Sequence, residues 1–103
     1  MTDQQVCLTL IVPRQLREEM FDYLAEQSDI VSGFTASRTA GHGGEVRLYT
    51  AAERVQGHAD QAMVQVILAH DEAVRLLDRI RGSFAGTRLV YWTTPVTEFG
   101  IID

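Results

Sequence analysis

Residues 5–12 read QVCLTLIV, and the alternation of this segment predicts a β-strand with apolar side chains on both faces. One face holds Val6, Leu8, Leu10 and Val12, and the other holds Cys7, Thr9 and Ile11. A strand that is apolar on both faces is typical of the interior of a sheet whose two faces are both covered. We therefore expect residues 5–12 to form a central strand, with a second apolar surface that also has to be buried.

The period of the apolar residues, together with the turn residues between them, predicts the elements that follow. In chain order these are an amphipathic helix from Pro13 to Gln27, a short strand from Phe34 to Arg38, a two-faced apolar strand from Gln61 to Ala69, a helix from Asp71 to Arg81 and a strand from Leu89 to Thr93. The second helix is expected to end at Gly82, and the last strand at Pro95. The apolar stripe of that helix consists of Ala73, Val74, Leu76, Leu77 and Ile80.

The segment from Thr39 to Asp60 is the part of the chain that least resembles a core. It has a strand-like pattern from Glu45 to Thr50, and its glycines are Gly41, Gly43, Gly44 and Gly57. A connection of this length in a compact domain is usually functional, disordered or ordered by a partner. We therefore expect a single domain over residues 1–103 with a long flexible loop over about residues 39–60.

The order strand, helix, strand, strand, helix, strand predicts an α+β fold, the ferredoxin-like βαββαβ sandwich, in which two helices cover one face of an antiparallel sheet. The opposite face is expected to be apolar as well. Its side chains would be Cys7, Thr9, Ile11, Met63, Ile67 and either Tyr91 or Trp92. On a chain this small such a face is more often buried by another copy than left in water, so the fold predicts an oligomer.

The composition limits the function classes. With 46% hydrophobic and 22% charged residues the chain is expected to fold, and its net charge of −5 argues against sequence-independent binding of nucleic acid. No apolar run reaches the roughly 18 residues of a membrane span, and the start MTDQQ lacks the basic residues of a signal peptide, so we expect a cytoplasmic protein. The single Cys7 cannot form an internal disulfide, and we expect it to be a small core hydrophobe rather than a redox-active group or thiolate ligand.

The sequence offers little for catalysis. It has no Gly-x-Ser-x-Gly elbow and no His-Glu-x-x-His motif, and Glu53 and Glu98 are single acids without an evident partner. We therefore do not expect an enzyme.

Two histidines, His42 and His58, are candidate metal ligands. Each lies beside glycine, which permits close backbone approach, and neutral imidazole is a frequent ligand of zinc and copper. The alternative is that both are solvated loop histidines or cap a turn. His70 is expected to have a structural role at the start of the following helix.

Three arginines, Arg47, Arg81 and Arg88, are candidates for binding an anionic ligand, because the guanidinium presents a planar fork to phosphate or carboxylate. Gly82 and Gly86 leave the backbone amides between them accessible to such a ligand. The alternative is that these arginines form salt bridges with the surplus acids.

Several segments carry a family resemblance. Residues 31–34 read VSGF, residues 41–42 read GH, and residues 48–53 and 64–67 read LYTAAE and VQVI. In this order and spacing they resemble the PII signalling proteins, the nitrogen regulatory PII-like superfamily, and the segments IRG at 80–82, GTR at 86–88 and PV at 95–96 extend the resemblance over nearly the whole chain. The start CLTLIVP at 7–13 and the pair YW at 91–92 resemble a small PII-like branch of unknown function associated with heavy-metal efflux operons.

The resemblance implies a homotrimer with its bare sheet faces turned inward, a mobile loop and clefts between subunits. Members of this superfamily sense small molecules and dock on a transporter or an enzyme in signal transduction. The resemblance also implies a ligand site, similar to an adenine-nucleotide site, where residues 82–88 of one subunit meet residues 33–38 of the next. Its residues would be Gly33, Phe34, Arg47, Arg81, Gly86, Thr87 and Arg88.

The chain also departs from the family pattern. Arg54 stands where nitrogen-sensing PII proteins have the tyrosine that is uridylylated, so we expect this control to be absent. The tail lacks the paired arginines that clamp nucleotide phosphates, so weak nucleotide binding or a smaller anion is expected.

Three functions follow from the sequence. The first is a PII-like trimeric regulatory protein that senses a nucleotide or another anion and controls a partner such as a membrane transporter or efflux pump. The second is a metal-binding module similar to the CutA proteins of the same fold, linked to heavy-metal efflux or tolerance. The third is a ferredoxin-like interaction domain without a ligand.

Overall fold

Strand β1 (Gln5–Pro13) lies in the interior of a four-stranded antiparallel sheet, as its two apolar faces predict. The strand order is β2-β3-β1-β4, with β2 at Thr35–Gly41, β3 at Ala59–Ala69 and β4 at Val90–Val96. The computed structural model describes residues 4–43 and 46–103 of the chain. Its α+β architecture confirms the ferredoxin-like fold.

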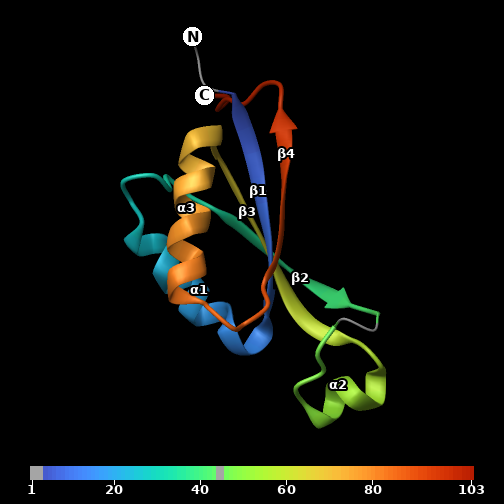
Figure 1. The fold of residues 1–103 in the computed structure, drawn as a ribbon. Coiled ribbons are helices and arrows are strands. Elements are labelled where there is room, and N and C mark those ends of the chain that lie inside the picture. Colours follow the sequence, from blue (N-terminus) through green and yellow to red (C-terminus); the bar gives the residue numbers. More distant parts are fainter. Residues whose placement is uncertain (1–3, 44–45) are drawn as a thin grey trace.

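Helices α1 (Arg17–Glu26) and α3 (His70–Ser83) lie side by side over one face of the sheet (Figure 1). The prediction that Pro13 begins the first helix is wrong. Pro13 has an extended backbone (φ −56°, ψ 144°) and pairs with Gln61 as the last residue of β1, and a 3-10 turn (Arg14–Leu16) leads into α1. A φ near −65° suits both the end of a strand and the start of a helix, so proline alone does not place the boundary.

The ends of α3 and β4 also differ from the prediction. Helix α3 continues through Gly82 to Ser83 and ends at its C-cap Phe84 (φ −120°, ψ 30°), and Gly86 (φ 82°) takes the left-handed conformation in the turn that follows. Strand β4 contains Pro95 rather than ending before it. Because β4 is an edge strand, a residue without an N–H does not break a ladder there.

The core lies between the sheet and the two helices. It is formed by Val6, Leu8, Leu10, Val12, Val64, Val66 and Leu68 from the sheet, Met20 and Leu24 from α1, and Ala73, Leu76 and Ile80 from α3. Val74, which was predicted to belong to the buried stripe, is 46% exposed. It follows Ala73 by one residue and so points about 100° away from it around the helix.

The helix-free face of the sheet carries a second set of apolar side chains. Directly opposite residues of antiparallel strands share a face, and Trp92 lies opposite Thr9, whereas Tyr91 lies opposite the core residue Leu10. Trp92 therefore belongs to the open face and Tyr91 to the helix side. Half-buried apolar neighbours on the open face are Cys7, Ile11, Met63 and Ile67.

The segment between β2 and β3 contains more secondary structure than the sequence predicted. Strand β2 continues to Gly41, β3 begins at Ala59, and helix α2 (Ala51–Gln56) lies between them beyond the end of the sheet (Figure 1). We call residues 46–58 the lobe. The predicted strand from Glu45 to Thr50 is wrong over residues 46–50, which are irregular, and Glu45 and Gly44 lie outside the described residues. Over residues 4–43 and 46–103, no helix has the length and apolar character needed to cross a membrane.

We predict that Leu76→Ala destabilises the protein by about 2–5 kcal/mol, because it opens a cavity beneath α3. Leu76 is fully buried, and Val74→Ala on the same helix serves as the matched control, with an expected change below about 0.5 kcal/mol. Urea unfolding of the two variants checks the assignment of the helix face. Equal losses in the two variants would contradict it.

Candidate functional site

The carboxylate of Glu53 lies at the centre of the lobe and is 1% exposed. Its Oε1 accepts hydrogen bonds from the backbone N–H groups of Tyr49 (2.6 Å) and Thr50 (3.1 Å), and its Oε2 accepts one from Asp60 (2.6 Å). The Thr50 hydroxyl oxygen in turn accepts from the Glu53 N–H (3.0 Å). Thr50 and Glu53 thus form a capping box at the start of α2. One side chain therefore ties the segment before α2 to the start of β3.

Hydrogen bonds to the charged form lower the pKa of a carboxyl group. The backbone N–H groups of Tyr49 and Asp60 are the main cause of a lowered pKa for Glu53, and burial opposes them. Glu53 is thereby held as an anion inside the lobe. Neither this pairing nor the buried position was expected from the sequence, although Thr50-x-x-Glu53 matches the capping-box pattern that could have revealed it.

A cavity of about 90 Å³ lies where the lobe meets the sheet. The register places Gln61 opposite Pro13 and Val90 opposite Ile11, so the floor of the cavity belongs to the helix-free face. The lining residues are Ile11 and Pro13 of β1, Ala59 and Gln61 of β3, Val46, Arg47 and Tyr49 of the lobe, and Thr87, Arg88 and Val90 at the start of β4. We call this cavity the lobe pocket.

The lobe pocket brings together three of the predicted ligand residues, Arg47, Thr87 and Arg88. Arg88 adopts φ 57°, a left-handed conformation that non-glycine residues rarely take. The preceding turn is tight, because both the N–H (3.3 Å) and the hydroxyl (2.6 Å) of Thr87 donate to the carbonyl oxygen of Phe84. This turn sets the point from which the Arg88 side chain leaves the backbone. Tyr49 and Gln61 also line the pocket and were not predicted.

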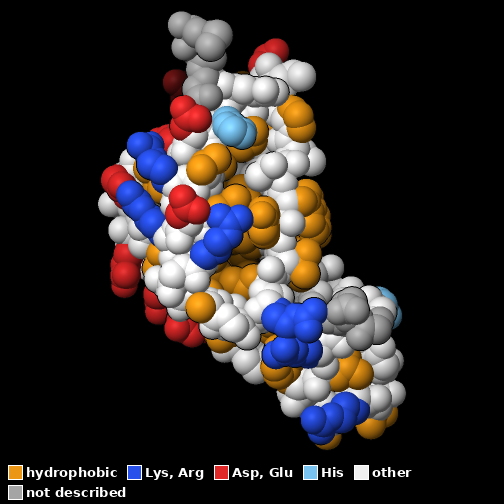
Figure 2. Space-filling view, viewed as in Figure 1, with side chains coloured by type: hydrophobic (Ala, Val, Ile, Leu, Met, Phe, Trp, Pro, Cys, Tyr) orange, Lys and Arg blue, Asp and Glu red, His pale blue; other side chains and the backbone are white. Residues whose placement is uncertain are grey.

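The charge distribution sets this region apart from the rest of the surface. Figure 2 shows basic side chains gathered where the body of the molecule joins the lobe, whereas acidic and basic side chains are mixed along the helices. The chain as a whole carries a net charge of −5, so an anion would find a locally basic region on an acidic protein.

Arg81 and Gly86 line a different cavity. This cavity of about 240 Å³ lies on the helix side of the sheet, and its other lining residues are Leu10, Leu77, Ile80, Phe84, Ala85, Leu89 and Tyr91. Arg81 donates to Asp78 (3.0 Å) and to the Tyr91 hydroxyl (2.9 Å), which is the salt-bridge role weighed as its alternative. Within one chain, Arg81 therefore lines a cavity on the helix side of the sheet, whereas Arg88 lines the lobe pocket on the open face.

Gly33 and Phe34 precede β2 and line neither of these two cavities. Phe34 packs against Phe21 of α1, with 5.6 Å between ring centroids. A site completed by these residues of a neighbouring subunit stays a prediction.

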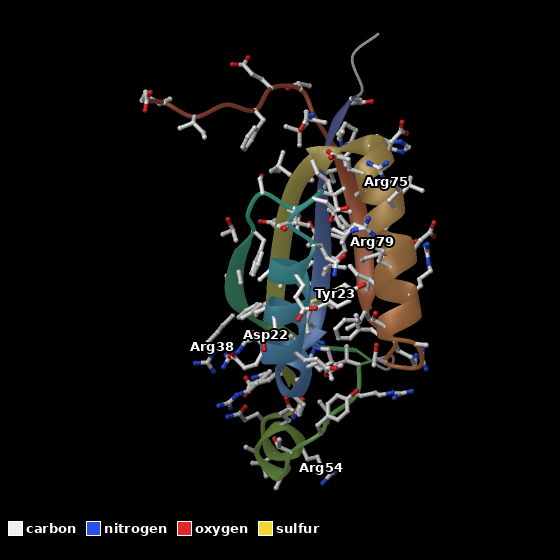
Figure 3. The ribbon with its side chains drawn as sticks, turned by 90° about the vertical axis from the view of Figure 1, so that its left-hand side faces the viewer. Asp22, Tyr23, Arg38, Arg54, Arg75 and Arg79 are labelled. Atoms are coloured by element: carbon white, nitrogen blue, oxygen red, sulfur yellow. The ribbon has the colours of Figure 1, made fainter. Side chains whose placement is uncertain are left out.

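The remaining candidate residues line neither of these two cavities. Cys7 is half-buried on the open sheet face rather than in the core, and His70 is the first residue of α3. Arg54 lies exposed on α2, at the end of the molecule formed by the lobe (Figure 3). His42 and His58 come together at the base of the lobe, with 5.2 Å between ring centroids.

Comparisons with known proteins agree on the fold. A family model described as a protein of unknown function, DUF3240, matches residues 2–103. A DUF3240 family protein from Shewanella baltica has a TM-score of 0.78 at 16% identity, covering 99% of this chain and 100% of the other. No curated protein matches the chain.

Two PII-like structures are also similar. CPII, a nitrogen regulatory PII-like protein from Thiomonas intermedia bound to ADP, AMP and bicarbonate, has a TM-score of 0.68 at 17% identity, covering 95% of this chain and 96% of the other. A PII-like protein from Thermus thermophilus has a TM-score of 0.63 at 14% identity, covering 93% of this chain and 91% of the other.

We predict that the amide signals of Tyr49 and Asp60 titrate with Glu53 at a midpoint below its ordinary pKa of 4.5, because they donate to its charged form. A lowered folded pKa contributes stability that is present above the unfolded pKa and lost as pH falls through the folded one. The lobe is therefore expected to loosen only at acid pH. Proton–nitrogen NMR spectra at decreasing pH check this, and a midpoint above 4.5 would contradict it.

We also predict that Glu53→Gln speeds hydrogen exchange at the amides of Tyr49, Thr50 and Asp60 at neutral pH. The neutral amide keeps one acceptor oxygen, so at least one of the three donors loses its partner. The amide of Leu8 in the core serves as the internal control. Unchanged exchange at all three of these amides would show that Glu53 does not hold the lobe.

Proposed function

The chain belongs to the DUF3240 family, and we propose that it is a PII-like regulatory protein that binds a small anionic effector in the lobe pocket. The observation that carries the proposal is the meeting of Arg47 and Arg88 at one cavity on a PII-like fold. Arginine is suited to phosphate and carboxylate groups, because its five N–H donors form a planar fork.

The size of the pocket limits the part of an effector that it holds. Pockets for drug-sized ligands usually measure about 300–1,000 Å³, whereas the lobe pocket measures about 90 Å³. It therefore suits bicarbonate or the phosphate group of a nucleotide, and the base of a nucleotide would lie outside it. ADP, AMP and bicarbonate in the similar protein CPII support anions of this kind as the first to test.

Effector binding is coupled to the lobe in this proposal. Arg47 and Tyr49 come from the lobe, whereas Thr87 and Arg88 come from the turn before β4, so a bound anion would contact both. An anion that contacts both would favour the lobe conformation observed here, by the free energy of contacts made only in that conformation. A partner that docks on the lobe would then respond to the effector.

The proposal includes a homotrimer, supported by the apolar open face of the sheet around Ile67 and Trp92. We also propose that the partner is a transporter or an efflux pump. In this proposal the protein is cytoplasmic and is not an enzyme. None of the three solved structures named above is described as metal-binding, so the CutA-like alternative gains no support from them.

We predict that Arg88→Ala weakens binding of ADP or bicarbonate by roughly ten- to a hundredfold, because a hydrogen bond to a charged group contributes about 1.5–3 kcal/mol. Isothermal titration calorimetry on the purified protein measures the effect. Arg54→Ala is the matched control, since Arg54 is an exposed lobe arginine that does not line the pocket. Unchanged affinity in Arg88→Ala, or an equal loss in Arg54→Ala, would overturn the placement of the site.

We further predict that light scattering gives three times the chain mass of 11.5 kDa for the wild type, and that Ile67→Asp dissociates the assembly or prevents folding. The new carboxylate would be buried without a partner in the trimer. Val74→Asp, on the exposed side of α3, should stay trimeric. A monomeric wild type would contradict the proposed trimer.

A further inference from the structure

His42 and His58 are brought together by the register of the sheet. Gly41 of β2 pairs with Ala59 of β3 as the final pair of the ladder. In an antiparallel pair the residues one step further along, His42 and His58, face each other on the next rung. Their ring centroids lie 5.2 Å apart, with 38° between the ring planes.

This separation fits two imidazoles on one metal ion. A Zn–N bond of about 2.0–2.1 Å puts each ring centroid about 3.2 Å from the ion. Two such rings at a tetrahedral angle have centroids about 5.2 Å apart, which is the distance that separates His42 and His58. The centroid separation is therefore compatible with two imidazoles sharing one ion.

The pair is open to solvent, and one carboxylate lies near it. The exposed His42 and the half-buried His58 can both be reached from solvent. Glu53 lies within electrostatic reach of His58, which is the smallest of the causes that lower the pKa of Glu53. Both Glu53 oxygens already accept backbone hydrogen bonds, so this carboxylate supplies negative charge nearby without acting as a ligand.

We propose that His42 and His58 bind one divalent transition-metal ion that prefers imidazole, such as Zn²⁺, Ni²⁺ or Cu²⁺. No cluster of three or more His, Cys, Asp or Glu side chains suited to a metal occurs within residues 4–43 and 46–103. The proposal therefore rests on two protein ligands and assigns the remaining coordination positions to water. With two protein ligands the ion binds reversibly and stays open to exchange. This site is separate from the lobe pocket and does not depend on the anion proposal.

An ion bound to this pair would also affect the conformation of the lobe. His42 precedes the lobe and His58 is its last residue, so an ion bound to both would close the lobe at its base. Closing the ends of a loop reduces its conformational freedom, and a ligand that binds only the closed form stabilises that form. Metal binding should therefore slow hydrogen exchange within residues 46–58.

Titration of the untagged protein with Zn²⁺ or Ni²⁺ by calorimetry tests the site, because the chain has only three histidines and His70 provides the matched control. We expect one ion per chain, and a loss of at least about tenfold in affinity in both His42→Ala and His58→Ala, since even outer-shell changes cost about 10–100-fold. His70→Ala should bind as the wild type does.

Copper-nitrogen hyperfine couplings in the electron paramagnetic resonance spectrum of the Cu²⁺ form provide a second readout. Two imidazole nitrogens are expected in the wild type and one in each single variant. Binding unchanged in His42→Ala, or lost equally in His70→Ala, would overturn the proposal. Arg88→Ala should leave metal binding intact, which separates a failure of this site from a failure of the anion site.

Discussion

Three backbone N–H groups, two from the lobe and one from the start of β3, converge on the Glu53 carboxylate, and both candidate sites lie beside that convergence. The bonds to Tyr49 and Thr50 fix the segment that supplies Arg47 to the lobe pocket. The bond to Asp60 fixes the start of β3, next to His58. A buried carboxylate without such donors would be strongly unfavourable, so the charge and the fold of the lobe support each other.

A second constraint comes from strands β1 and β3, which are apolar on both faces. Helices α1 and α3 cover one face, and the open face provides both the floor of the lobe pocket and the surface assigned to subunit contacts. The turn between α3 and β4 lies at the boundary of the two faces. Arg81, before this turn, lines the cavity on the helix side, and Arg88, at the end of the turn, lines the lobe pocket on the open face. Assembly and ligand binding would therefore use neighbouring parts of one sheet face.

The sequence predicted the strands and helices whose apolar period is strong, as in residues 5–12, because that period directly reports burial. It missed α2, although the Thr50-x-x-Glu53 capping box was visible, because six residues with little apolar patterning give no helical period. Arg47, Thr87 and Arg88 were predicted as ligand residues, but their shared pocket depends on strand register. The same holds for His42 and His58, whose facing positions follow from the pairing of Gly41 with Ala59. Local patterns do not specify such long-range pairing.

The central claim is that the lobe held by Glu53 forms one wall of an anion site completed by Arg88. A crystal structure of the protein grown with ADP and bicarbonate tests it most directly. We expect an anionic group within hydrogen-bonding distance of Arg47 and Arg88, with the lobe in the conformation described here and the Glu53 carboxylate still bonded to the backbone of Tyr49 and Asp60. An anion bound instead beside Arg81 on the helix side, or a lobe that is disordered around a bound anion, would contradict the claim.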